Sequence, residues 1–316
     1  MTGTDIKLAK ALLENGQLVG IPTETVYGLA GNAYDPKAVS QIFAVKERPA
    51  FDPLIIHTSG IGRIPEFVQH LPQQAALLME TFMPGPLTLL LNKKALIPDI
   101  VTAGLPRVAI RIPKHQLTLS LLEQLDFPLA APSANPFGYI SPTTAQHVAD
   151  QLGDKIPYIL DGGAARVGLE STIIGFENKV PVIYRKGGLS IDRIRDLIGD
   201  VMVKEQSTSN PASPGMLISH YAPGAPVILG NIPSLVKKNS HKKLGTISMD
   251  TYIDSLPKAH QLLLSPKLDM EEAARNLFSG MRYLDSLNLD LIIATLVPEE
   301  GLGIAINDRL RRAAGK

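Results

Sequence analysis

A polar segment rich in serine and proline divides the chain about two thirds of the way along its length. This segment, EQSTSNPASPG, lies within the change of composition between Lys204 and Pro226. Such runs are typical of linkers, because they bury little apolar surface and interrupt regular structure. The 316 residues of the chain leave room for one large or two ordinary domains. We therefore predict a first domain over residues 1–204, a linker over 205–225 and a second domain over 226–316.

Short apolar segments of strand length alternate with helical patterns on both sides of this linker. Asp35 and Pro36 predict an N-cap and a first helical residue for a helix that ends near Lys46. Some strands of the first block follow one another directly, which indicates a mixed sheet. The second block alternates strands and helices, which is typical of a small doubly wound, Rossmann-like domain. We therefore predict an α/β (α+β-like) fold.

The expected elements share one pattern, apolar runs or helical periodicity bounded by glycine, proline or polar residues. Strands are expected at 18–21, 54–57, 87–91, 108–112, 129–131, 158–160, 172–176, 182–184, 227–229, 244–248, 261–264 and 291–296. Helices are expected at 6–15, 35–46, 74–82, 115–125, from 141, at 190–198, at 270–287 and from about 305.

Composition excludes several classes of function. The chain has no cysteine, which rules out disulfides, zinc–thiolate sites and a cysteine nucleophile. Its 31 basic and 30 acidic side chains give a net charge of +1, which argues against a strongly basic nucleic-acid-binding protein. Residues 1–16 contain no apolar signal-peptide core, and no run of about 18 apolar residues occurs. We expect a cytoplasmic protein with no membrane partner.

Several common functional motifs are also missing. The sequence has no P-loop, no dinucleotide-binding glycine fingerprint and no G-x-S-x-G elbow. Its seven histidines are scattered, with no H-x-x-x-H or H-x-H pair. We therefore predict that protein side chains bind no metal ion.

Polar and cationic side chains gather instead where the predicted strands and helices end. Residues 22–28 read PTETVYG and residues 131–138 read APSANPFG, so hydroxyl groups and small residues would allow close approach of a polar ligand. Five cations stand at such ends: Lys46, Arg48, Arg107, Arg111 and Arg185. Together these residues favour binding of a polyanion and a small polar molecule, as in phosphoryl or nucleotidyl transfer driven by positioning and electrostatics.

Each of these segments also has an ordinary structural explanation. The PTETVYG segment is compatible with a simple strand and turn, and Lys46 with Arg48 would complement a helix dipole. Arg107 and Arg111 lie on one face of their strand, where water alone would satisfy them. The SHYAP motif at residues 219–223 is harder to explain, because a linker has no structural reason to carry histidine and tyrosine together.

Eight segments, in their order and spacing, resemble those of threonylcarbamoyl-AMP synthases. They are GIPTETVYGLAGNA, IFAVKERPAFDPLIIH, PGPLTLLL, VAIRIP, PLAAPSANPFGYISPT, GLESTIIGF, IYRKGG and SHYAPGAP. The resemblance covers about residues 5–200 as a YrdC-like domain, and SHYAP with the second block is similar to the two-domain form of the family. It implies a twisted mixed sheet with helices around a concave cationic surface, followed by a Rossmann-like domain.

The resemblance also implies an activity and its partners. Members of the family make L-threonylcarbamoyladenylate from L-threonine, bicarbonate and ATP, with Mg²⁺ accompanying the nucleotide, and release pyrophosphate. This nucleotidyl transfer precedes formation of N6-threonylcarbamoyladenosine in tRNA. The resemblance therefore implies a downstream tRNA threonylcarbamoyl-transfer complex and allows a weak contact with tRNA itself.

The site residues implied by the resemblance follow from the family's motifs, position by position. The implied threonine-binding residues are Thr25, His57, Arg111, Ala131 and Ser171. The implied ATP-binding residues are Lys46, Arg48, Asp52, Arg107, Ser133, Ser141, Arg185 and Tyr221. Lys46 and Arg48 match the family's Lys-x-Arg motif, which faces the phosphates, and are the implied catalytic pair. Tyr221 implies that the linker folds over the site as a lid.

One position departs from the family's pattern. Relatives usually carry asparagine at the position of Asp52. A carboxylate close to a triphosphate needs Mg²⁺ or a lysine partner to offset the repulsion between two anions. Whether Asp52 contacts ATP is therefore an open question at this point.

The implied mechanism has two steps. The threonine amine takes up CO₂ or bicarbonate, and the carboxylate of the resulting N-carboxy-threonine attacks the α-phosphate of ATP. Lys46, Arg48 and Arg185, with Mg²⁺, would reduce the repulsion between these anions.

Two other interpretations stay open from the sequence. One is an RNA-binding or regulatory protein with a YrdC-like surface, although the near-neutral charge and few aromatic residues argue against it. The other is a carbamoyl-adenylate-forming enzyme like the related domain of hydrogenase-maturation proteins. That domain usually accompanies zinc-finger and acylphosphatase modules, which this sequence does not show.

Overall fold

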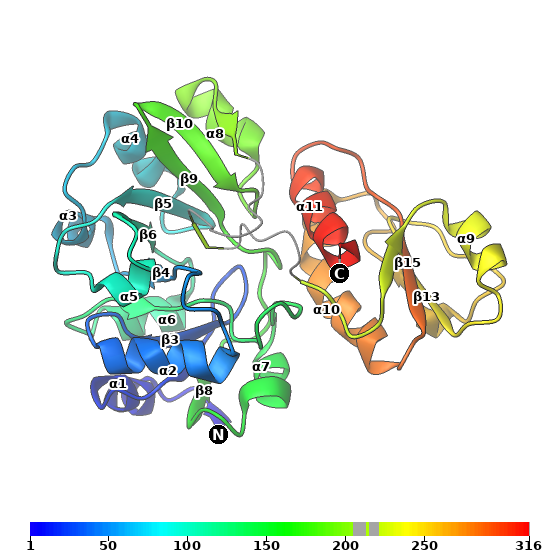
Figure 1. The fold of residues 1–316 in the computed structure, drawn as a ribbon, viewed down its shortest axis with the longest axis horizontal. Coiled ribbons are helices and arrows are strands. Elements are labelled where there is room, and N and C mark those ends of the chain that lie inside the picture. The colour runs from blue at the N-terminus through cyan, green and yellow to red at the C-terminus, as the bar shows by residue number, and fades with distance from the viewer. Residues whose placement is uncertain (205–212, 215–220, 316) are drawn as a thin grey trace.

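The computed structural model describes residues 1–204, 213–214 and 221–315, which form two sheets with helices around them (Figure 1). The first sheet has eleven strands in the order β1-β8-β2-β3-β7-β4-β6-β5-β9-β10-β11. Their bounds are β1 (Thr2–Gly3), β2 (Val19–Ile21), β3 (Gly28–Asn32), β4 (Ile55–His57), β5 (Leu87–Asn92), β6 (Arg107–Arg111), β7 (Leu129–Ala130), β8 (Tyr158–Leu160), β9 (Thr172–Glu177), β10 (Val180–Arg185) and β11 (Met202–Val203).

This sheet is mixed, as the sequence predicts. Strand β4 runs parallel to β6 and antiparallel to β7, while β5 is antiparallel to β6 and parallel to β9. The β4–β6 register places His57 opposite Arg111. Two residues that are 54 positions apart in the sequence therefore become neighbours at one edge of the pocket described below.

Helices cover both faces of the first sheet. Helices α1 (Ile6–Glu14) and α6 (Gln116–Leu122) contribute to one buried cluster with β2, β7 and β8. Helices α2 (Pro36–Lys46), α4 (Gln73–Phe82), α7 (Ala145–Leu152) and α8 (Ile191–Ile198) contribute to the larger cluster on the other face. Two single-turn helices complete this domain, α3 (Ile64–Phe67) and α5 (Asp99–Thr102).

The second sheet is small and wholly parallel. Its order is β12-β15-β13-β14, with bounds β12 (Val227–Leu229), β13 (Leu244–Ser248), β14 (Gln261–Leu263) and β15 (Leu291–Ala294). Helices α10 (Met270–Ser286) and α11 (Gly303–Ala314) pack on one face and α9 (Ile232–Lys238) on the other. The doubly wound arrangement expected for the second block is confirmed.

The two halves of the chain pack directly against each other, with α10 and α11 on the side nearest the first sheet (Figure 1). At Gly168, an added Cβ would lie 2.5 Å from the Cα of Arg275 in α10, so this contact requires glycine. Asp285 accepts hydrogen bonds from the hydroxyl of Tyr139 and from the amide of Gly224, the latter at 2.8 Å. The α10 side chain of Arg282 donates to the main-chain oxygen of Ser141 at 3.3 Å.

One expected helix start is corrected, and several elements were not predicted, among them β3 and α9. The helix expected to start at Ser141 begins at Ala145, where the Thr144 side chain caps it by accepting from the His147 amide. Strand β3 was not expected, because its sequence GLAGN carries two glycines where an apolar run is the usual signal. Helix α9 was also not expected; its Asn231 cap and early proline are its sequence signals.

The predicted linker covers residues 205–225. Residues 205–212 and 215–220, which include most of that segment, lie outside the described residues. The boundaries at 204 and 226 therefore stay predictions. Within the described residues, no helix combines the length and apolar character that crossing a membrane requires.

Candidate active site

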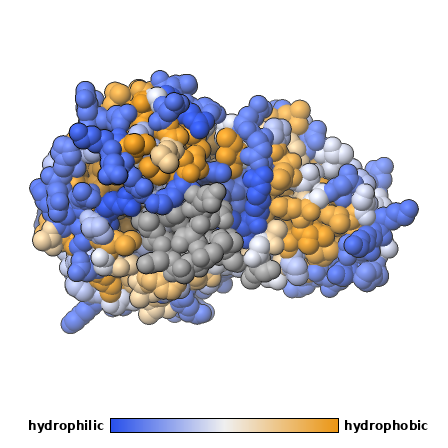
Figure 2. All heavy atoms as spheres, turned by 45° about the horizontal axis from the view of Figure 1, so that its top comes forward, coloured by the Kyte–Doolittle hydropathy of each residue, from blue (hydrophilic) through white to orange (hydrophobic). Residues whose placement is uncertain are grey.

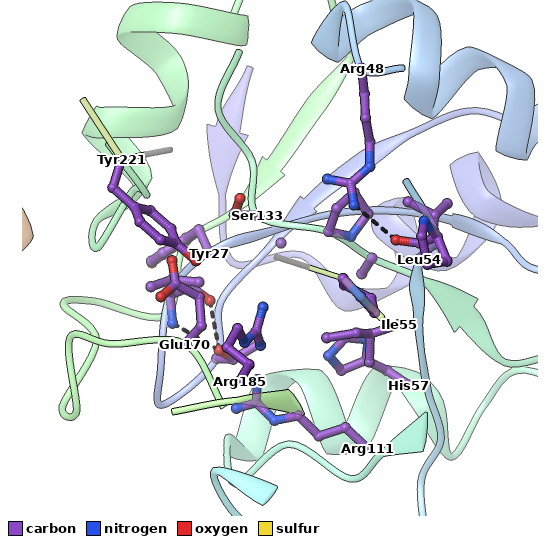
Figure 3. Close-up of a pocket in the computed structure, with 17 residues that line it drawn as sticks. Tyr27, Arg48, Leu54, Ile55, His57, Arg111, Ser133, Glu170, Arg185 and Tyr221 are labelled. Atoms are coloured by element: carbon purple, nitrogen blue, oxygen red, sulfur yellow. Dashed lines mark hydrogen bonds between the residues drawn. The ribbon is translucent and has the colours of Figure 1, made fainter. Parts of the chain in front are cut away.

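A pocket lies in the first domain where β4, β6 and the loops after β2, β7 and α2 meet, close to the contact with the second domain (Figure 3). Its described lining combines hydroxyl, guanidinium, imidazole and small apolar groups. The lining residues are Thr23, Val26, Tyr27, Gly28, Arg48, Pro53, Leu54, Ile55, His57, Arg111, Ala131, Pro132, Ser133, Glu170, Arg185, Pro214 and Tyr221. Seven of the residues predicted from the sequence are among them: Arg48, His57, Arg111, Ala131, Ser133, Arg185 and Tyr221.

At one end of the pocket, Arg111 and His57 lie side by side at the carboxyl ends of β6 and β4 (Figure 3). The Arg111 guanidinium forms a buried ion pair with Glu24, with Nη2 2.8 Å from Oε2, and its Nε donates to the main-chain oxygen of Gly85 at 3.2 Å. Nδ1 of His57 is buried without a hydrogen-bond partner among the described residues. This end therefore offers a cation and a free imidazole nitrogen to a small polar ligand.

Burial and, to a smaller extent, the neighbouring positive charge of Arg111 together lower the pKa of His57 to about 3. The imidazole is therefore neutral at physiological pH. A neutral ring beside a guanidinium group can take part in hydrogen bonding without adding charge to the pocket.

This shift in pKa predicts a loss of stability in acid. Below pH 6.5 the unfolded chain protonates His57 while the folded chain does not, so the free energy of unfolding falls as pH falls from about 6.5 towards 3. At about 1.4 kcal/mol per pKa unit, His57 alone would remove about 3 kcal/mol between pH 7 and pH 4. Denaturant titrations of the wild type and of His57→Gln would measure this difference, which should be smaller in the variant. The exposed His241→Gln change serves as the control and should keep the wild-type pH dependence.

Two of the implied threonine-binding residues, Thr25 and Ser171, lie just behind the residues that line the pocket. Thr25 is fully buried, and its hydroxyl lies 2.8 Å from that of Thr23, which lines the pocket. The Ser171 hydroxyl lies 2.7 Å from the Thr88 hydroxyl and accepts from Nη2 of Arg185 at 3.1 Å. The structure thus places Thr25 and Ser171 as supports of lining residues.

At the other end of the pocket, Arg48 is held by an acidic partner and by main-chain oxygens. Its Nη2 lies 2.9 Å from Oδ2 of Asp52 and 2.8 Å from the main-chain oxygen of Pro53, and its Nε donates to the main-chain oxygen of Asp52 at 3.1 Å. Asp52 is fully buried and sits behind Arg48, outside the described lining. The positive charge that offsets the buried carboxylate of Asp52 is therefore that of Arg48, in the same loop.

Lys46 is also buried behind the lining. Its ammonium group donates to the main-chain oxygen of Ser133 at 2.5 Å and to that of Asn135. Burial lowers the pKa of Lys46 well below its usual value, and the positive charge of Arg48 lowers it further. In this arrangement Lys46 fixes the loop that carries Ser133 into the pocket.

Arg185 and Glu170 lie close together in the lining (Figure 3), and Glu170 pairs with Arg309 of α11 in the second domain. Nε of Arg185 donates to the main-chain oxygen of Ser171 at 3.0 Å. Burial lowers the pKa of Arg185 to about 10, which leaves it charged at neutral pH. The hydroxyl of Ser141 donates to Glu170, so Ser141 reaches the pocket only through this carboxylate.

Arg107 lies at the opposite end of β6 from Arg111, four residues or roughly 13 Å along the strand. Its Nη1 donates to the hydroxyl of Tyr184 at 2.6 Å, and its guanidinium lies 4.9 Å from the centre of that ring. The structure does not bring Arg107 to the described lining, and its ATP contact stays a prediction.

Two acidic residues that shape the site were not predicted from the sequence. Glu24 neutralises Arg111, and Glu170 lies in the lining between Ser141 and Arg185. Both occur in the PTET and LEST segments, where a carboxylate stands among hydroxyl residues. A carboxylate among the hydroxyl residues of a predicted site segment is the signal that points to them.

The fold and the site together define a two-domain α/β protein with a pocket lined by arginine, histidine and hydroxyl side chains. The family model described as "Telomere recombination" matches residues 11–187, and the model described as "Threonylcarbamoyl-AMP synthase, C-terminal domain" matches residues 189–315. The chain belongs to the threonylcarbamoyl-AMP synthase family.

Individual relatives match over almost the whole chain. A threonylcarbamoyl-AMP synthase of Pyrococcus abyssi is 41% identical, with 98% of this chain and 94% of the relative covered. One of Bacillus subtilis is 39% identical, with 98% and 93% covered. The crystal structure of P. abyssi Sua5 complexed with L-threonine superposes with a TM-score of 0.93 at 39% identity, covering 100% of this chain and 97% of that one.

Proposed function

We propose that this protein forms L-threonylcarbamoyladenylate from L-threonine, bicarbonate and ATP, with release of pyrophosphate. The observation that carries the proposal is a single pocket lined by three arginines, Arg48, Arg111 and Arg185. Planar guanidinium groups bind carboxylates and phosphates through paired hydrogen bonds. Family membership, and the L-threonine complex of the P. abyssi protein, favour an amino acid and a nucleotide as the two anions.

In this proposal Arg111 binds the carboxylate of threonine. The ligand carboxylate would bind the guanidinium beside Glu24, which balances the charge of Arg111 when the pocket is empty. The free Nδ1 of His57 would take a hydrogen bond from the ligand, and the small side chain of Ala131 leaves room beside it.

Arg48 at the opposite end and Arg185 at the side of the pocket would bind the phosphates, with Ser133 and Tyr221 also in the lining. The Lys46 ammonium has three donors, two of which are used by main-chain oxygens, so the third would be available to a phosphate oxygen. The negative phosphates would raise the pKa of Lys46 again and keep the amine charged.

The chemical step is a substitution at the α-phosphorus. A carboxylate oxygen of N-carboxy-threonine forms the new bond to this phosphorus, and the bond to the bridging oxygen breaks, so pyrophosphate leaves with that electron pair. Both reactants are anions, and preorganised cations reduce the cost of bringing them together. This step makes the protein a nucleotidyltransferase, and its product would pass to a tRNA threonylcarbamoyl-transfer complex.

Magnesium would enter as part of the MgATP substrate. The carboxylates of Asp52 and Glu170 are each engaged by an arginine. Within the described residues, no group of three or more histidine, aspartate or glutamate side chains is placed to hold an ion. The donors therefore fit an ion coordinated mainly by the phosphates, whose chemical role is to neutralise their charge.

Omission of single substrates tests the proposed function. Pyrophosphate release should require L-threonine, bicarbonate and ATP together, because the attacking carboxylate does not exist until the amine has been carboxylated. The measurement is a coupled pyrophosphate assay with each component left out in turn, with L-alanine replacing L-threonine as a control. Release at the full rate without threonine would contradict the proposal.

A further inference from the structure

Helix α11 of the second domain brings a fully buried arginine to the wall of the pocket. Nε and Nη2 of Arg309 both donate to Oε2 of Glu170, at 3.1 and 3.0 Å, and Nη1 donates to Asp308 at 2.8 Å. Arg309 is 0% exposed. The other carboxylate oxygen of Glu170 accepts from the hydroxyl of Ser141. A continuous chain of hydrogen bonds therefore runs from the second domain to a lining residue and to a predicted ATP contact.

The same guanidinium also packs on Tyr221, a lining residue next to the predicted linker. The Arg309 guanidinium carbon lies 4.9 Å from the centre of the Tyr221 ring, and that of Arg312 lies 4.5 Å from it. The ring of Phe278 in α10 lies 5.5 Å away. Three side chains of the second domain thus hold one aromatic wall of the pocket.

Tyr221 needs this support because its backbone is unfavourable. Its φ of +66° lies in the left-handed region, which is costly for residues other than glycine. Its side chain is nevertheless 1% exposed. The position of the ring is therefore fixed by its surroundings, and Arg309 is part of them.

Arg309 also determines the charge state of Glu170. Burial alone would raise the pKa of this carboxyl, but Arg309, Arg185 and the Ser141 hydrogen bond hold it below its usual value. Glu170 is therefore ionised and keeps a fixed acceptor for the Ser141 hydroxyl. Without Arg309 the carboxylate would lose the partner that makes two of its hydrogen bonds.

We propose that Arg309 is a positioning residue through which the second domain completes the nucleotide end of the pocket. It orients Ser141 by way of Glu170 and holds the ring of Tyr221 in place. The inference rests on the proposed function, and it gives the second domain a direct part in binding ATP. Among the described residues, Arg111 pairs instead with Glu24 and the main-chain oxygen of Gly85, so the threonine end shares none of the hydrogen bonds of this chain.

Replacing Arg309 by methionine tests this role. The Arg309→Met variant should raise the KM for ATP by at least about tenfold, because Ser141 and Tyr221 would no longer be held in place for the nucleotide. This is about the effect of losing one hydrogen bond to a charged group. The KM for threonine should change less than twofold. The control is Arg311→Met, on the same helix, where the side chain is 46% exposed and pairs with Glu299 at the surface. It should leave both KM values unchanged.

Further measurements separate positioning from folding and from the function itself. A purely structural role would lower the melting temperature and the active fraction without raising the KM for ATP, and that result would overturn the inference. If the methionine variant does not fold, Arg309→Lys, which keeps the charge but loses the paired hydrogen bonds and the flat contact with Tyr221, carries the same expectation. Failure of the proposed function would appear differently, as a wild-type protein that releases no threonine-dependent pyrophosphate.

Discussion

Replacement of Arg111 by alanine should lower kcat/KM for L-threonine by at least about tenfold, because it removes a charged hydrogen-bonding partner of the ligand carboxylate. The same change would leave Glu24 buried without its cation. An uncompensated buried charge costs about 3–5 kcal/mol, so the free energy of unfolding should fall by a similar amount. The measurements are steady-state kinetics with varied threonine and a denaturant titration at pH 7.

A double variant separates the two effects. In Arg111→Met with Glu24→Gln, the buried charge disappears from both sides and the side-chain volume is kept, so most of the stability should return. Threonine binding should stay as weak as in the single variant, because the cation is still missing. Normal threonine kinetics in the double variant would show that Arg111 does not bind the substrate carboxylate.

Replacement of Arg48 by alanine should raise the KM for ATP by at least about tenfold and also destabilise the fold. Arg48 lines the pocket, and its partner Asp52 is fully buried behind it. Loss of the guanidinium would remove a phosphate ligand and leave Asp52 without its ion pair, at a cost of about 3–5 kcal/mol. ATP titrations and denaturant unfolding would measure the two effects.

Two variants serve as controls for Arg48. The Arg48→Met, Asp52→Asn double change should restore stability but not ATP affinity, because it removes the buried charge from both sides. Arg195→Ala removes an arginine that is 45% exposed and lies 3.7 Å from Asp192, so it should change stability by less than about 1 kcal/mol. Unchanged ATP affinity in Arg48→Ala would remove Arg48 from the proposed phosphate site.

The surface of the molecule bears on the RNA-binding alternative. Hydrophilic and hydrophobic residues lie side by side over both domains on the face drawn in Figure 2. The 31 basic and 30 acidic side chains of the sequence nearly cancel. A nucleic-acid surface draws most of its affinity from many phosphate contacts, whereas the arginines that line the pocket are few and enclosed. This distribution of charge favours the proposed small anionic ligands over RNA.

Local signals in the sequence predicted the elements that carry those signals. Asp35 caps α2 and Pro36 begins it, because both residues act on backbone groups of their own first turn. The apolar periodicity of residues 270–287 predicted α10 to within one residue of its observed end. Strand β3 was not predicted, because the reason for its glycines lies in other segments of the chain. A Cβ at Gly31, for example, would lie 2.8 Å from the Leu18 side chain.

The residue types of the site were also readable along the chain, because cations and hydroxyls at the ends of strands are local features. The tertiary structure decided which of these cations and hydroxyls lie next to one another. Arg107 and Arg111 lie on one strand and looked equivalent, yet only the parallel register of β4 and β6 puts Arg111 beside His57, while Arg107 packs on Tyr184.

The sequence by itself thus determined the class of fold and the family, and it predicted which residues would bind anions. The tertiary structure decided the pairing of charges, because an ion pair depends on distance in space and leaves no mark at either position in the sequence. Glu170 and Arg309 are 139 residues apart, and only the docking of α11 against the pocket brings them within 3.0 Å.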